Sequence, residues 1–192
     1  MPKTPNILVF AGSARVASIN KKLALLAAGL AEKEGAHVTY IDLKDYPLPI
    51  YDEDLEQAEG LPPNALRLKE LFLAHDALLM ACPEYNSSIT PLWKNTIDWI
   101  SRSSADEAPL AAYKGKVAAL LAASPGGFGG LRGLVHYRQI LGNIGVVVLP
   151  DQLTVPAAHL AFAEDGTLSD PSLVKRLGGV VQSLVKWASC SA

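Results

Sequence analysis

The sequence predicts an α/β protein in which a five-stranded parallel sheet carries helices on both faces. Short runs that are apolar at almost every position alternate along the chain with longer segments of helical periodicity. Strands of that composition are typical of parallel sheets, because both faces of such a sheet are buried. The 192 residues are 49% hydrophobic and 19% charged, so they can form a sizeable core, and we expect one domain over residues 1–192.

The first part of the chain supplies two strands and two helices. Apolar runs predict strands at residues 7–11 and 37–41, and a helix is expected between them at residues 18–34. A second helix is expected at residues 64–74. The stretch 51–63 before it is acidic, and we expect a mobile surface loop there.

The rest of the chain continues the alternation. A third strand is expected at residues 77–82, and Pro83 ends it because proline has no N–H to donate to a neighbouring strand. Thr90 and Pro91 then mark a helix start, as a capping residue and a first-turn proline. The remaining predicted elements are helices at 91–101, 131–141 and 171–188 and strands at 117–122 and 145–149.

Charge and composition exclude several classes of function. A formal net charge of −2 without a cluster of lysine and arginine does not suit nucleic-acid binding. The longest apolar runs are of strand length and no export signal is evident, so we expect no membrane association. Two cysteines suit a reducing compartment, which predicts the cytoplasm. The four histidines lack the spacing of a zinc site, so we expect no metal.

The loop after the first predicted strand carries an unusual density of hydrogen-bond donors. Four polar side chains lie within eight residues, directly before a helix: Ser13, Arg15, Ser18 and Asn20. The N-terminus of a helix has unpaired N–H groups and partial positive charge, so it attracts anions. A lone serine there would more simply cap the helix, with the arginine in solvent. Four such side chains favour a phosphate site.

Two further loops are expected at the same edge of the sheet, because each follows a parallel strand. In residues 83–91, Tyr85 offers a flat face for a planar ring, and Asn86 offers polar groups for its edge. Thr90 and Pro91, at the end of this segment, are also explained by the start of a helix alone. In residues 124–130, four glycines around Phe128 let backbone N–H groups approach a ligand, whereas a flexible turn needs only one or two. The three loops therefore predict one binding site.

Together the three loops resemble those of the NADPH-dependent FMN reductase family, flavodoxin-like proteins that include quinone, azo-dye and chromate reductases. The family's phosphate loop, GSxRxxSxN, is matched at residues 12–20. Its flavin-ring loop, PEYN, is matched at residues 83–86, and its Ser-x-Gly-Gly pattern at residues 124–127. The resemblance covers residues 6–156, and its departures are small: Ala14, Val16 and Ala17 replace bulkier or more polar residues that are common in the phosphate loop. It implies a three-layer flavodoxin-like sandwich with strand order 2-1-3-4-5.

The resemblance also implies which residues bind FMN. The phosphate would be held by Ser13, Arg15, Ser18, the backbone of Ile19, and Asn20. The isoalloxazine ring would be bordered, mostly through backbone groups, by Pro83, Glu84, Tyr85, Asn86, Ser124 and Gly127. Fixed backbone N–H groups can stabilise charge on the reduced ring, so no catalytic side chain is required. Cys82 is expected to be a small buried hydrophobe, and Glu84 an exposed carboxylate.

The implied activity is that of an FMN-dependent NAD(P)H oxidoreductase. NADPH or NADH would give hydride to the flavin. A quinone, an azo compound, a free flavin or a metal oxyanion such as chromate would then take electrons from the same face, in ping-pong order. Two alternatives stay open, a flavodoxin-type electron carrier and a non-catalytic flavin-binding protein. The weak net charge of −2 does not favour the carrier, which would need an acidic docking surface.

The helix expected at residues 91–101 is apolar nearly all round, with Leu92, Trp93, Ile97 and Trp99. Such a helix must bury two faces. One face would cover the sheet. We expect the other to meet a second subunit in a homodimer or homotetramer, the assembly that the resemblance also implies. The alternative is that the C-terminal helix covers this face within one chain.

Overall fold

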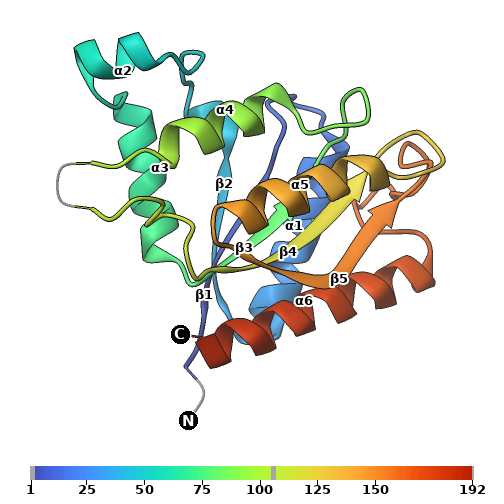
Figure 1. Cartoon of the computed structure of the whole chain (residues 1–192). Coiled ribbons are helices and arrows are strands. Elements are labelled where there is room, and N and C mark those ends of the chain that lie inside the picture. The colour runs from blue at the N-terminus through green and yellow to red at the C-terminus, as the bar shows by residue number, and fades with distance from the viewer. Residues whose placement is uncertain (1–2, 105–106, 192) are drawn as a thin grey trace.

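The computed structural model describes residues 3–104 and 107–191. Its five strands form one parallel sheet in the order β2-β1-β3-β4-β5 (Figure 1), which confirms the predicted fold class and strand order. The strands span β1 Asn6–Ala11, β2 His37–Asp42, β3 Ala77–Ala81, β4 Val117–Ala123 and β5 Val147–Val155. Because β1 lies between β2 and β3, and β3 pairs with β4, the loops after β1, β3 and β4 leave neighbouring strands at one edge.

Helices cover both faces of the sheet, so the molecule has three layers (Figure 1). Helices α1 and α6 pack on one face, and α3, α4 and α5 pack on the other. The helices span α1 Ile19–Lys33, α2 Glu53–Glu59, α3 Pro63–Ala74, α4 Pro91–Ile100, α5 Leu131–Asn143 and α6 Pro171–Ser191, and a 3-10 turn, η1, spans Leu43–Asp45. Within the described residues, no helix combines the length and apolarity that crossing a membrane requires.

The core beneath α3, α4 and α5 is rich in aromatic rings, and it corrects the expectation for α4. Trp93 and Trp99 are fully buried by their own chain. The Trp93 ring lies 4.8 Å from that of Phe10, between ring centroids, and the Trp99 ring lies 5.0 Å from that of Tyr51. The two tryptophans are therefore covered within the chain, and the expectation that a second face of α4 meets another subunit stays a prediction. The alternative, that the C-terminal helix covers α4, is wrong, because α6 lies on the opposite face of the sheet.

The acidic stretch 51–63 contains a helix, so the predicted surface loop is wrong. Helix α2 begins after Asp52, whose side chain accepts a hydrogen bond from the Asp54 amide at 2.9 Å. Acidic residues in its first turn, such as Glu53, stabilise the helix by interacting with the partial positive charge at its N-terminus. No residue of α2 is buried. Without a buried stripe, the helix leaves no apolar periodicity in the sequence.

Strand β5 continues to Val155, whereas the sequence predicted its end at residue 149. Pro150 follows that predicted end, and a proline has no N–H to donate inside a sheet. β5 is an edge strand, and its pairing with β4 shifts between Ala118 and Leu120, opposite the proline. An irregular edge position tolerates a missing N–H, so the strand resumes after it.

Candidate functional site

The three loops at the carboxyl edge line one pocket of about 100 Å³. Nine of the eleven residues predicted to bind FMN line it: Ser13, Arg15, Ser18, Ile19, Asn20, Pro83, Glu84, Tyr85 and Ser124. Asn86 and Gly127 do not, and both are exposed outside it. Two lining residues, Ala123 and Pro125, were not predicted. They flank Ser124 at the end of β4, so the start of the third loop is the only sequence signal for them.

The serines of the first loop are buried at the start of α1. Ser18 is the N-cap of the helix, and its hydroxyl oxygen accepts a hydrogen bond from the Lys21 amide at 3.4 Å. The Ser13 hydroxyl oxygen accepts one from the Arg15 amide at 3.3 Å. A hydroxyl that accepts keeps its own hydrogen for donation. The first turn of α1 carries no acidic residue, so the partial positive charge at this helix end is not neutralised by its own side chains.

Arg15 supplies the positive charge of the pocket. It is exposed, and its guanidinium donates one hydrogen bond, to the Ala17 carbonyl at 3.2 Å. A guanidinium has five N–H donors, so most of this group stays available for an anion such as a phosphate monoester.

Asn20 has a structural role that the sequence did not reveal. Its side-chain amide donates to the Ala123 carbonyl at 2.8 Å and accepts from the Ala123 amide at 2.9 Å. The side chain thereby fixes the start of α1 to the end of β4, and one of its two N–H hydrogens remains. Its predicted contact with a phosphate stays a prediction.

Glu84, in the second loop, is not the exposed carboxylate that the sequence suggested. Its side chain is largely buried, and it accepts hydrogen bonds from the Arg132 guanidinium at 2.8 and 3.0 Å and from the Gly133 amide at 3.0 Å. Burial alone would raise the pKa of Glu84. The bonds from Gly133 and Arg132 outweigh burial, so the pKa lies below its ordinary value. The carboxylate therefore stays charged and is bound within the protein, which removes it from acid–base chemistry near neutral pH.

Four further hydrogen bonds fix the shape of the second loop. The Tyr137 hydroxyl, buried in α5, donates to the Pro83 carbonyl at 3.2 Å and accepts from the Thr90 amide at 3.4 Å. Tyr85 and Ser88 exchange two backbone hydrogen bonds of 3.0 Å, which closes a tight turn. The sequence did not single out Tyr137, because its helical spacing from other buried residues of α5 is that of a core residue.

The two central residues of this turn, Asn86 and Ser87, have positive φ angles of 50° and 65°. Asparagine tolerates that conformation, whereas serine adopts it rarely. The turn presents Tyr85 with 48% of its surface exposed beside the pocket. A flat aromatic ring in that position can contact a planar ligand.

The glycines of the third loop serve two different purposes. A Cβ added to Gly129 would lie 2.8 Å from backbone atoms of Val155 and Pro156, and one added to Gly130 would lie 2.8 Å from the Ala122 Cβ. Both glycines also have positive φ, so the protein's own packing requires them. A Cβ on Gly127 would meet no atom within 4 Å. Only the first part of this loop leaves its backbone open to a ligand.

The described residues hold no group of three or more His, Cys, Asp and Glu side chains that could bind a metal. Cys82 is buried, as expected, and burial raises the pKa of its thiol far above its ordinary value, so it is not a nucleophile. What the site offers is a set of neutral and cationic donors at a helix N-terminus, beside an exposed aromatic ring and an open backbone.

Relatives of this chain are named as FMN reductases and quinone oxidoreductases, which fits a site built to bind a phosphate and a planar ring. The sequence matches the NADPH-dependent FMN reductase family over residues 5–160. An NAD(P)H-dependent FMN reductase of Pseudomonas aeruginosa is 36% identical over 182 residues, which cover 94% of each chain. An NAD(P)H:quinone oxidoreductase of Solanum tuberosum is 35% identical over 182 residues, which cover 90% of this chain and 87% of that protein.

Solved structures agree with these relatives. FerB, a flavoenzyme NAD(P)H:(acceptor) oxidoreductase from Paracoccus denitrificans, superposes with a TM-score of 0.79 at 32% identity, over 97% of this chain and 98% of FerB. A flavodoxin from the domain Archaea superposes with a TM-score of 0.61 at 10% identity, over 95% of this chain and 98% of the flavodoxin, which shows the fold alone. This chain belongs to the NADPH-dependent FMN reductase family and is an FMN-dependent NAD(P)H oxidoreductase.

Proposed function

We propose that this oxidoreductase binds the FMN phosphate in the pocket at the start of α1 and passes electrons to small planar acceptors, quinones above all, at an open flavin face. The quinone reductases among its relatives support this acceptor class. Azo compounds, free flavins and metal oxyanions such as chromate are proposed as further acceptors, because an open flavin face does not select acceptors by their shape. Either NADPH or NADH is proposed as donor.

The observation that carries the proposal is the donor set of the pocket. Two hydroxyls and a guanidinium surround a helix N-terminus, and the one carboxylate in the lining, Glu84, is already paired with Arg132. A phosphate dianion therefore meets donors without meeting an unpaired negative charge. The residues present fit FMN for this reason.

The size of the pocket supports an open flavin ring. A volume of about 100 Å³ lies well below the roughly 300–1,000 Å³ of sites that enclose a drug-sized ligand. We infer that the pocket encloses the phosphate end and that the ring lies along the loop surfaces outside it. The two predicted residues outside the pocket, Asn86 and Gly127, are then placed to contact the ring through backbone groups.

FMN, when bound, would supply the redox chemistry that links a reduced nicotinamide to the electron acceptor. The protein's own work is binding and orientation. The first loop would hold the phosphate, Tyr85 would contact the ring, and backbone N–H groups of the second and third loops would stabilise negative charge at the ring edge without moving. One shared face for donor and acceptor gives ping-pong kinetics.

The test is anaerobic reduction of the purified, FMN-loaded protein. NADPH or NADH should bleach the flavin absorbance, and a quinone added afterwards should restore it. Initial rates against both substrates should give parallel double-reciprocal lines. Protein that carries FMN and is not bleached by either nicotinamide would contradict the proposal, and so would restoration that requires a protein partner.

We also propose that the chain forms a homodimer or homotetramer in the cytoplasm. An apolar groove between the segment before α2 and the start of α4 supports assembly, with Ile50 87% exposed beside Leu48 and Leu92. The cytoplasm is proposed because two free cysteines suit a reducing compartment.

Sedimentation of the protein and of an Ile50→Glu variant tests the assembly. An unmodified chain that sediments as a monomer contradicts it.

A further inference from the structure

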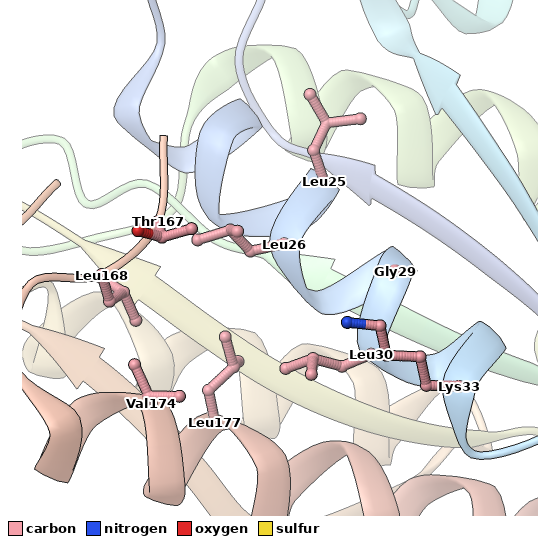
Figure 2. A pocket seen from close by; sticks show the side chains of 9 residues that line it. All are labelled: Leu25, Leu26, Gly29, Leu30, Lys33, Thr167, Leu168, Val174 and Leu177. Atoms are coloured by element: carbon pink, nitrogen blue, oxygen red, sulfur yellow. The ribbon is translucent and has the colours of Figure 1, made fainter. Parts of the chain in front are cut away.

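An apolar groove lies between α1 and α6, on the face of the sheet that these two helices cover (Figure 2). It has a volume of about 270 Å³, and leucines of both helices line it together with Leu168, in the segment before α6. None of its lining residues lines the pocket at the carboxyl edge. The groove is therefore a second concavity, and the flavin site does not account for it.

The groove exposes apolar surface that the chain itself does not cover. Leu168 and Leu177 are buried at its base, whereas Leu25 and Val174 at its rim are 52% and 43% exposed. An apolar ligand seated between these side chains would remove their surfaces from water, which favours binding.

Gly29 keeps the groove open. It lies in the middle of α1, and an added Cβ would meet no atom within 4 Å apart from the helix's own backbone. Alanine would fit there and would favour the helix more than glycine does. The packing of the chain thus does not require a glycine at this position. Its missing side chain leaves room between α1 and α6.

Lys33 gives the groove its charge. It is the one charged residue among those lining the groove, and within residues 3–104 and 107–191 it makes no ion pair. Figure 2 shows its ammonium group alongside α1, above Leu30. The other polar lining side chain, Thr167, already donates its hydroxyl to the Asp165 carboxylate at 2.7 Å. An anion at the mouth of the groove would therefore bind to Lys33.

We propose that this groove binds a small free amphiphile with one anionic head group and an unbranched alkyl tail. The head contacts Lys33, and the tail lies between the leucines of α1 and α6. A cavity of roughly 150 Å³ is enough to hold benzene, so this groove has room for a medium-length chain. This site does not depend on the proposed function of the flavin pocket.

Calorimetric titration of the full FMN-loaded protein with decanoate tests the proposal. Decanoate should bind saturably, with one site per chain. Octanoate should bind about 15-fold more weakly, because each buried methylene changes affinity about fourfold. Decyltrimethylammonium, which has the same tail and a positive head, should not bind. Absence of saturable decanoate binding, or equal affinity for the cationic probe, would overturn the proposal.

Two variants locate the site. Gly29→Leu fills the groove and should abolish decanoate binding. Gly142→Leu, at another helical glycine with no atom within 4 Å of an added Cβ, lies in α5 on the opposite face and should bind normally. Lys33→Gln, on the surface, should weaken decanoate about fivefold or more and leave 1-decanol unchanged. FMN reduction by NADPH should be unchanged in all three.

The remaining outcomes also decide the question. Decanoate binding that survives Gly29→Leu places the ligand elsewhere and overturns the proposal. So does a Lys33→Gln effect of equal size on decanoate and on 1-decanol. Binding to vesicles of anionic lipid without binding of free decanoate would show that the groove contacts a membrane surface, which contradicts a free ligand.

Discussion

The loop after β1 and the loop after β3 line the same pocket, yet their polar groups are used in opposite ways. In the first loop the hydroxyls of Ser13 and Ser18 keep their hydrogens, and Arg15 makes one contact, with a neighbouring carbonyl. In the second loop the Glu84 carboxylate and the Pro83 carbonyl are both bound by side chains of α5.

This difference indicates that the first loop binds the ligand and that the second loop is held in shape by the rest of the protein. Polar side chains with unused hydrogens can contribute directly to ligand affinity, whereas polar groups already bonded within the protein contribute to the stability and shape of a loop. Substitution of Arg15, whose side chain is exposed, should therefore change FMN affinity with little change in stability. Substitutions in the second loop should change stability first.

The third loop contains both a residue that packing requires, Gly129, and a residue open to a ligand, Gly127. The largest expected change in stability is at Gly129. Gly129→Ala places a Cβ 2.8 Å from the backbone at a φ of +60°. We expect a loss of about 3 kcal/mol or more in the free energy of unfolding, measured in urea. Gly127→Ala, with no atom within 4 Å, should stay within about 0.5 kcal/mol of the unmodified protein. Equal losses in the two variants would show that the distinction within this loop is wrong.

Arg15→Ala tests whether the first loop contributes to FMN affinity. A hydrogen bond to a charged group contributes about 1.5–3 kcal/mol, so FMN affinity should fall roughly 10- to 100-fold. The unfolding midpoint of the flavin-free protein should barely move, because this side chain is exposed. Flavin fluorescence quenching measures the first quantity and urea denaturation the second. A loss of stability with unchanged FMN affinity would reverse the roles assigned here.

Glu84→Gln tests the supporting role of the second loop. The variant keeps the size of the side chain but removes the charge that pairs with Arg132 and accepts from the Gly133 amide. We expect the flavin-free protein to lose about 1–2 kcal/mol of unfolding free energy. If stability is unaffected while FMN affinity falls as far as in Arg15→Ala, then Glu84 contacts the ligand and the comparison fails.

The same variant has a defined pH dependence. The folded pKa of Glu84 lies below its ordinary value, because hydrogen bonds from Gly133 and Arg132 outweigh the effect of burial, which is to raise it. A carboxyl of this kind stabilises the fold above its unfolded pKa, about 4.3, and loses that stabilisation as the pH falls through the folded value. The difference in unfolding free energy between the protein and Glu84→Gln should therefore be largest above about pH 5 and shrink on acidification. A difference that grows on acidification would contradict this sign.

Of the two substitutions that test the second loop, Tyr137→Phe should have the smaller effect. It removes a hydroxyl that donates to the Pro83 carbonyl at 3.2 Å and accepts from the Thr90 amide at 3.4 Å. Both contacts are long, so we expect a loss of about 1 kcal/mol in unfolding free energy and about a twofold change or less in FMN affinity. Paired urea and fluorescence measurements check this. A loss as large as that of Gly129→Ala would mean that the loop depends on Tyr137 far more than its geometry indicates.

The sequence predicted what depends on local patterns. Apolar strands that alternate with amphipathic helices predict a parallel sheet, and the first loop carries its donors within eight residues, so both were recognisable. Helix α2 escaped recognition because none of its residues is buried and no apolar periodicity marks it.

Long-range partners could not be predicted. Glu84 and Arg132 are 48 residues apart, and Asn20 and Ala123 are 103 residues apart, so nothing local distinguishes them from solvated side chains. The tryptophans of α4 indicated burial correctly, but the sequence could not show that rings of the same chain would cover them. Tertiary packing decides such contacts, and one sequence alone does not reveal it.

The measurement that tests the account most directly compares FMN with riboflavin, which lacks the phosphate, on the unmodified protein and on the Ser13→Ala, Arg15→Ala double variant. The account predicts that the unmodified protein prefers FMN by about 100-fold or more and that the double variant binds the two ligands with similar affinity. Equal affinity for the two ligands in the unmodified protein would contradict the claim that the first loop binds the phosphate. A preference for FMN that the double variant retains in full would contradict it as well.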